Sequence, residues 1–494
     1  MSGYCLRAAS LVASLCAAAA CSGDGADEIE RSSARVGVAA PVLRASQGSL
    51  GLTYHRNALT RDVLVTMGND GRPVPRILES WSESADGLVW TFKVRSGVRF
   101  HDGTLVTAGL LAPHVRTELT GSSLGALADV SAEGDDVIRI SLKEPYAFLF
   151  EDLSVISALH TVDRKVIGTG PYEVIEESPD RLLLKAAAGY YRGEPEISQV
   201  EVQLFPDQRN AWSALMRDEI DMLYEVSRDA LQFVRSESSV TVESFPRAYV
   251  YLFGLNRAHP ALADARVRQA LDRAVDRQNL VDTAMAGEGE PAQGHIWPRH
   301  WAYDASAGAI PHDPAGAVRL LTEAGLPVRE LKGRMPARLR LKCLVYEPLR
   351  ELALVLQRQL AEVDVDLQIE MASTGQLIDR ISRGDFESFI FEMTSLRGFK
   401  FPYLFWHSGT PFLKHGYSGA DDVLDQIRHA PNAAELKAAA SAFQRRVHED
   451  PPAVFLAWGR TSRAVSTRYQ IPSGDEDVYH TIARWKLAPK AVRP

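Results

Sequence analysis

The sequence predicts an α/β protein with more than one domain. Its 494 residues exceed the roughly 250–300 at which a single hydrophobic core stops growing. Short alternating segments typical of strands, such as 137–142 and 200–205, are interspersed with amphipathic helical segments such as 349–363. This mixture indicates α/β architecture. A hydrophobic fraction of 46% with 24% charged residues is that of an ordinary soluble globular protein.

The first twenty residues differ in composition from the rest of the chain. Arg7 is their only charged residue, and residues 8–20 are all small or apolar. Such a run is too short to span a bilayer as a helix, but it suits the apolar core of a secretory signal. We therefore expect residues 1–20 to be a signal peptide. Residues 21–36 are mostly small or polar, which predicts a flexible tether.

The residues before Cys21 resemble a bacterial lipobox, although Ala18 stands where Leu or Val is usual. This resemblance implies that Cys21 is acylated and anchors a lipoprotein on the periplasmic side of the cell envelope. Ordinary cleavage, which would give a soluble periplasmic protein, is the alternative. Cys5 and Cys16 leave with the signal, so no internal disulfide is expected. Cys343 then remains, and we expect a small buried hydrophobic residue there.

Residues 76–108 carry the most specific local pattern. Trp81 is followed by a polar turn at 84–87 and by an alternating segment at 89–94. An Asp-Gly turn between extended runs predicts a β-hairpin. Trp90 lies centrally in the alternating segment, so we expect it in the core.

The sequence of this hairpin, ESW…DGxxWTFKxRxGVxFHDGTxxTA, is much rarer than its structure. It resembles the hallmark segment of family 5 extracellular solute-binding proteins, the dipeptide- and oligopeptide-binding receptors of ABC importers. Residues 168–172, 266–277 and 313–325 continue the resemblance in the same order. We expect 168–172 to form a tight turn. The arginines of 266–277 alternate with aspartates, which predicts paired charges on an exposed helix.

The resemblance implies a two-lobed periplasmic-binding-protein fold of the class II type, with lobes joined by two crossing strands. The first lobe has a main subdomain and an accessory subdomain. We expect the main subdomain at 37–50, 161–252 and 460–494, the accessory subdomain at 51–160, and the second lobe at 253–459. The crossings are expected near residues 253–256 and 457–459.

The sequence gives little support for nucleic-acid binding, metal binding or catalysis. The net charge of −8, with no basic cluster, argues against a nucleic-acid partner. Zinc-protease, phosphate-loop and dinucleotide motifs do not occur. A Gly-x-Ser-x-Gly string at 121–125 lacks the strand that a nucleophile elbow needs. His295, His300 and His312 are expected to be histidines of wet surface loops. We expect no catalysis, no cofactor and no metal.

The resemblance implies a monomeric substrate-binding protein that captures a peptide or peptide-like small solute between its lobes and delivers it to a membrane permease. A sensor or chaperone-like receptor on the same fold is the alternative, and an enzyme is the second. Expected ligand-binding residues lie near the crossings and on the rim of the second lobe: Tyr249, Tyr251, Asn256, Arg397, Phe399, Tyr403, Trp406 and His407.

One departure concerns the ligand's amine. Peptide-binding relatives commonly carry an Asp that pairs with the peptide's ammonium, and the resemblance places Pro402 at that position. No acidic residue occurs between Glu392 and Asp421. Because a buried ammonium without a carboxylate is costly, we expect a ligand without an amine, or an anionic solute that meets Arg397 or Lys400. Asp62 is the only acid of the shortened 43–62 segment that could replace the missing one.

Overall fold

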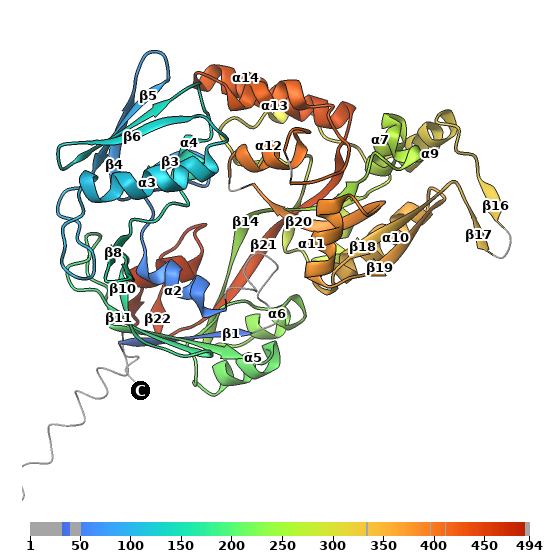
Figure 1. The fold of residues 1–494 in the computed structure, drawn as a ribbon. Coiled ribbons are helices and arrows are strands. Elements are labelled where there is room, and N and C mark those ends of the chain that lie inside the picture. The colour runs from blue at the N-terminus through green and yellow to red at the C-terminus, as the bar shows by residue number, and fades with distance from the viewer. Residues whose placement is uncertain (1–31, 40–50, 332–333, 396, 411, 490–494) are drawn as a thin grey trace, which may run out of the picture.

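The computed structural model describes residues 32–39, 51–331, 334–395, 397–410 and 412–489 (Figure 1). The expected signal peptide and Cys21 lie outside these residues. None of the helices within these ranges is long and apolar enough to cross a membrane.

A mixed sheet of eleven strands among the described residues runs through both lobes (Figure 1). Its order is β10-β11-β12-β1-β13-β21-β14-β20-β18-β19, with β15 beside β21. The first lobe contributes β10 (Tyr172–Glu177), β11 (Arg181–Ala186), β12 (Gln199–Phe205), β1 (Ser33–Ala39) and β13 (Met222–Leu223). The second lobe contributes β20 (Ser388–Thr394), β18 (Leu339–Val345), β19 (Val365–Met371) and β15 (Gly289–Pro291). Cys343 is fully buried on β18, which confirms its expected role.

Two long antiparallel strands, β14 (Val240–Leu255) and β21 (Ala453–Ser466), join the lobes. Their pairing is irregular between Pro246 and Val250, where proline lacks the N–H that a sheet needs. From Tyr249 onward β14 already pairs with β20 of the second lobe. The chain therefore changes lobes at about residues 246–250, a few residues earlier on the same strand than the crossing expected near 253–256.

The main subdomain of the first lobe begins earlier than expected. β1 starts at Ser33, and its Ala34 and Val36 are fully buried between β12 and β13. The tether predicted to extend to residue 36 therefore overlaps this strand. The strand was not recognised from the sequence because its small residues give it little apolar character. The helix α2 (Leu52–Thr60) packs on the same sheet through Leu52 and Leu59. It belongs to the main subdomain, so the accessory subdomain does not begin at 51.

In place of the tight turn expected at 168–172, residues 170–171 form a bend that leads into β10, and the close packing of this segment explains two glycines. A Cβ on Gly168 would lie 2.1 Å from the Thr60 carbonyl oxygen, and one on Gly170 would lie 2.3 Å from the Thr60 carbonyl carbon. The segment thus seats the start of β10 against the end of α2. The subdomain is completed by α5 (Gln208–Met216), α6 (Arg228–Arg235), β22 (Tyr469–Gln470), the 3-10 helix η5 (Val478–Arg484) and β23 (Lys486–Leu487).

The accessory subdomain is a four-stranded sheet in the order β4-β5-β7-β6. Its strands are β4 (Leu78–Glu83), β5 (Val89–Val94), β7 (Val137–Leu142) and β6 (Leu127–Glu133), and its helices are α3 (Ala108–Ser122) and α4 (Leu149–Leu153). Two short hairpins, β2 (Val65–Met67) with β3 (Pro73–Pro75) and β8 (His160–Val162) with β9 (Lys165–Ile167), flank them. The β4–β5 hairpin confirms the prediction. Its core residue is Phe92, which is fully buried, whereas Trp90 is only half-buried near the turn.

Besides its strands, the second lobe contains eight helices among the described residues (Figure 1). They are α7 (Ala265–Arg273), α8 (Arg277–Ala284), α9 (Pro314–Glu323), α10 (Arg350–Ala361), α11 (Thr374–Arg383), α12 (Lys400–Trp406), α13 (Asp421–Arg428) and α14 (Ala433–Glu449). Of these, α12, α13 and α14 lie toward the accessory subdomain (Figure 1). Short 3-10 turns η2 (Pro260–Ala263), η3 (Ala305–Ala307) and η4 (Glu347–Leu349), and a hairpin of β16 (Arg329–Leu331) and β17 (Arg334–Ala337), complete it.

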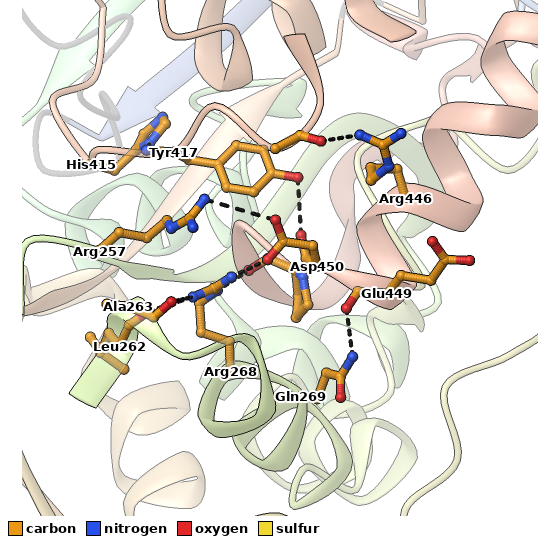
Figure 2. Close-up of polar contacts among 12 residues, drawn as sticks. Arg257, Leu262, Ala263, Arg268, Gln269, His415, Tyr417, Arg446, Glu449 and Asp450 are labelled. Atoms are coloured by element: carbon orange, nitrogen blue, oxygen red, sulfur yellow. Dashed lines mark hydrogen bonds and ion pairs between the residues drawn. The ribbon is translucent and has the colours of Figure 1, made fainter. Parts of the chain in front are cut away.

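The charges at 266–277 are not all on an exposed face, so this expectation is wrong. Arg268 is fully buried. Figure 2 shows its guanidinium between Asp450 and the carbonyl oxygens of Leu262 and Ala263. Tyr417 donates to the Asp450 carbonyl oxygen at 3.0 Å. Because several acceptors satisfy the buried charge, Arg268 ties α7 to the end of α14.

Candidate functional site

A cavity of about 660 Å³ lies between the lobes where β14 crosses from one to the other. The crossing itself supplies Phe245 to Tyr249 as one wall. The accessory subdomain contributes residues of the β2–β3 hairpin, the main subdomain contributes residues of η5, and the second lobe contributes Thr394 and Arg397. All three parts of the molecule therefore meet at this cavity, which is within the size range of small-molecule sites.

The cavity is cationic although the whole chain is acidic. Six arginines and three acidic residues line it, which gives a formal charge of +3 against −8 for the chain. The six are Arg76, Arg192, Arg247, Arg397, Arg463 and Arg484, and the acids are Glu225, Glu476 and Asp477. Low-dielectric walls focus such a field, so the cavity favours anions.

The charged side chains on the wall formed by the main subdomain form ion pairs with one another. Arg463 donates to both oxygens of Asp477, at 3.1 and 2.7 Å, and its guanidinium lies 3.7 Å from the centre of the Tyr224 ring. Burial alone would raise the pKa of Asp477, but the Arg463 charge and its hydrogen bonds hold it below its ordinary value. Arg484 likewise pairs with Glu476. Two of the cavity's acids are therefore already neutralised.

Arg397 is held differently. It follows β20 with a φ of 60°, a left-handed conformation that non-glycine residues rarely adopt. Its Nη1 donates to the Met67 carbonyl oxygen at 3.1 Å, whereas its Nε is buried and has no hydrogen-bond partner among the described residues. Burial lowers the pKa of this guanidinium. Arg397 thus retains donor capacity that the protein itself does not use.

Two of the eight expected ligand-binding residues line the cavity, Tyr249 and Arg397. Tyr249 lies beneath the guanidinium of Arg247, with 4.2 Å between the guanidinium carbon and the ring centre. Tyr251 follows it on β14 but points into the protein and is 1% exposed. Asn256 donates to the Phe386 carbonyl oxygen at 2.7 Å and is buried beyond the cavity.

The four expected residues at 399–407 lie in packing contacts outside the cavity. The Phe399 ring packs edge-on against His300. Tyr403 and His407 stack on each other with ring centres 4.7 Å apart. Trp406 donates from Nε1 to Nδ1 of His295 at 2.8 Å. The sequence placed these aromatics correctly after a strand, but α12 turns them into the second lobe.

The accessory subdomain contacts the first residues of α12. Glu151 of α4 accepts backbone N–H groups from Phe399 at 2.8 Å and Lys400 at 3.0 Å. Lys400 in turn pairs with Asp152 and donates to the Ser122 carbonyl oxygen. We call Glu151, Asp152 and their partners the latch. Lys400 is therefore engaged by the protein, and the expectation that it meets an anionic solute is wrong.

Asp62 is also removed from the site. It does not line the cavity, and its carboxylate accepts a hydrogen bond from the Tyr190 hydroxyl at 2.8 Å. Burial raises its pKa despite that bond. The charged lining of the second lobe therefore consists of Arg397 alone among the described residues, with no acid to receive an ammonium.

The expectation of wet surface histidines is wrong for two of the three. His295 is fully buried and His300 is 6% exposed. Burial lowers the pKa of His295 to about 3. Its Nδ1 accepts from Trp406, so the proton lies on Nε2, which faces the Thr394 carbonyl oxygen at 3.2 Å. Within the described ranges, no three His, Cys, Asp or Glu residues are grouped so that they could hold a metal ion.

Comparison with known proteins identifies the architecture. The family model for bacterial extracellular solute-binding proteins, family 5 Middle, matches residues 72–412. The chain belongs to this family. The two-lobed fold expected from the sequence is confirmed, and the family is one of solute-binding proteins that are described as extracellular.

Relatives and solved structures agree with the family. A probable di/tripeptide-binding protein 5 of Pseudomonas aeruginosa is 25% identical over 450 residues, covering 81% of this chain and 84% of the relative. The dipeptide-binding protein of Escherichia coli is 24% identical over 439 residues, covering 78% and 80%. NikA from Brucella suis in complex with Fe(III)-EDTA has a TM-score of 0.80 at 20% identity, with 92% of this chain and 100% of that chain covered. AppA from Bacillus subtilis in complex with a nonapeptide has a TM-score of 0.73 at 19% identity, with 92% and 99% covered.

Sequence reasoning missed five arginines that line the cavity: Arg76, Arg192, Arg247, Arg463 and Arg484. Arg247 lies within two residues of the predicted Tyr249, and Arg463 lies four residues after the crossing expected at 457–459, so nearness to the crossing strands was the available signal. The other three come together only through the fold.

Proposed function

We propose that this protein is the solute-binding subunit of an ABC importer and that it captures a peptide-like small solute between its lobes. The cavity at the crossing strands, walled by both lobes and by the accessory subdomain, carries this proposal. The relatives, which are named as di- and tripeptide-binding proteins, support the substrate class.

The strands that connect the lobes would allow the lobes to close on a solute. β14 and β21 are the strands that pass between them, and their pairing is irregular at Pro246 to Val250. A local break in pairing is a suitable hinge because few hydrogen bonds resist bending there. A solute that contacts both walls has higher affinity for the closed state and shifts the protein toward it. Closure excludes water and strengthens each polar contact.

The proposed function also includes delivery of the solute to a permease and attachment of the protein to the membrane. The closed form is presented to a membrane permease, and the protein acts as a monomer by binding alone, without catalysis. Acylated Cys21 would hold the mature chain at the membrane, and residues between Cys21 and β1 would give it reach. The short distance to Ser33 leaves about a dozen residues for this, which span at most about 40 Å when fully extended.

Native mass spectrometry of the purified mature protein tests the proposal. We expect a complex with a small peptide-like molecule that is released on denaturation and identified by fragmentation. Rebinding of that molecule should raise the melting temperature, because a ligand that binds the folded state stabilises it. A protein that is recovered without ligand and whose melting temperature is unchanged by any member of a di- and tripeptide library would contradict it.

A further inference from the structure

Four of the six cavity arginines have no ion-pair partner among the described residues: Arg76, Arg192, Arg247 and Arg397. Two of the three cavity acids form their ion pairs with the other two arginines. Glu476 pairs with Arg484, Asp477 pairs with Arg463, and the charge of Glu225 acts on Arg463. Arg247 is stacked on Tyr249. Arg76, Arg192 and Arg397 are left to face the cavity without an ion pair among the described residues, and their charges are compensated only in part, by Asp62 and Glu476.

Arg397 is the most informative of the three, because two features of its own structure are unfavourable. Its Nε is buried without a partner, and a buried unsatisfied donor is destabilising. Its positive φ is a second source of strain, and glycine would relieve it. Strain of this kind persists at ligand-binding positions because the side chain is needed there. The protein uses Nη1 of Arg397, through the Met67 carbonyl oxygen, but leaves Nε without a partner among the described residues.

Arg76 and Arg192 belong to the first lobe and line the same cavity. Burial lowers the pKa of Arg76, and the charge of Arg192 lowers it further. Two like charges therefore act on each other at the edge of the cavity. The nearby acid, Asp62, is held by Tyr190 and has a raised pKa, so it relieves this repulsion only in part. An anion between the two guanidinium groups would relieve it fully.

We infer that the captured solute carries two acidic oxyanion groups, one bound by Arg397 of the second lobe and the other by Arg76 and Arg192 of the first. This inference rests on the proposed function and adds the chemical class of the solute. The planar guanidinium fork matches carboxylate and phosphate groups alike. A solute with an acidic group at each end would contact both lobes, and its binding would then favour the closed arrangement.

The test uses the full mature protein and an equimolar mixture of tripeptides in native mass spectrometry. The mixture contains neutral, basic, Asp- or Glu-containing and phosphoserine-containing members, together with the neutral members after succinylation of the amine. Succinylation replaces the ammonium by a carboxylate and leaves the remaining peptide unchanged. We expect the acidic or succinylated members to be bound at least tenfold more than the neutral ones. The phosphoserine members distinguish phosphate from carboxylate.

Arg397→Gln should lower the affinity for the preferred members about 10- to 100-fold, as expected for a lost charge-assisted hydrogen bond, and Arg397→Lys should lower it less. Arg319→Gln is the matched control, because it removes an exposed arginine of the same lobe that is distant from the cavity lining. Without ligand, Arg397→Gln should melt no lower than the parent. A melting temperature several degrees lower would show that Arg397 serves the fold, and would overturn the inference.

The outcomes separate this inference from the proposed function. Binding of neutral or basic members as tightly as acidic ones would overturn the inference and leave peptide capture in place. Binding restricted to acidic members but unaffected by Arg397→Gln would also overturn it. If no member of the mixture binds, the proposed peptide-like capture fails, and the inference fails with it.

Discussion

Replacing Glu151 by Ala removes the carboxyl group at the centre of the latch between the accessory subdomain and the second lobe. Glu151 is 5% exposed and accepts the backbone N–H groups of Phe399 and Lys400. Alanine leaves both buried donors without an acceptor. Each such donor costs about 1–3 kcal/mol. The free energy needed to open the latch should therefore be about 2–6 kcal/mol lower in the variant.

Hydrogen exchange measures this loss where it arises. The amides of Phe399 and Lys400 should exchange at least about 30-fold faster in Glu151→Ala, which corresponds to about 2 kcal/mol. Glu144→Ala is the matched control, since Glu144 also joins α4's subdomain to the second lobe, through Arg428 at 2.7 Å, but its side chain is 41% exposed. Exposed pairs contribute about 0–1 kcal/mol. If the two amides exchange as slowly in Glu151→Ala as in the parent, the latch does not depend on this carboxyl group.

Three further predictions concern stability and anchoring. Phe92→Ala should destabilise the accessory subdomain by about 3–5 kcal/mol and Trp90→Ala by clearly less, since only Phe92 is fully buried; equal losses on urea unfolding would contradict this core assignment. Burial raises the pKa of Glu151 from its ordinary 4.5 to about 8, so the folded state holds a proton that the unfolded state releases between these values. This proton should contribute on the order of 5 kcal/mol to the free energy of unfolding. The contribution should be complete below about pH 4.5 and lost as pH rises through 8. Thermal unfolding of the parent should therefore weaken with rising pH more steeply than that of Glu151→Ala, and parallel pH profiles would exclude this titration. Cys21→Ser should abolish labelling with a palmitate analogue, and labelling that persists in the variant would place the anchor elsewhere.

The sequence by itself determined the family, the two-lobed fold and the hairpin at 78–94. The family and the two-lobed fold followed from the resemblance of four collinear segments to a known family, whereas the hairpin followed from turn residues and the two-residue alternation of buried side chains. The same alternation placed Cys343 in a buried strand. It failed for β1, where Ala34 and Gly37 supply too little apolar surface to reveal a central strand. It also failed for Arg268, because a charge on a helix looks the same whether it faces water or a buried carboxylate.

Only the tertiary structure decided the site. Arg76, Arg192 and Arg397 are separated by more than a hundred residues and meet at one cavity because three subdomains converge there. Conversely, the aromatics at 399–407 were expected at the ligand, but Glu151 binds the start of their helix and turns them into packing contacts. The periodicity of a segment reports which of its own side chains are buried. It does not report which distant segment covers them, and this second fact decides whether a polar group faces a ligand, a partner in the protein, or water.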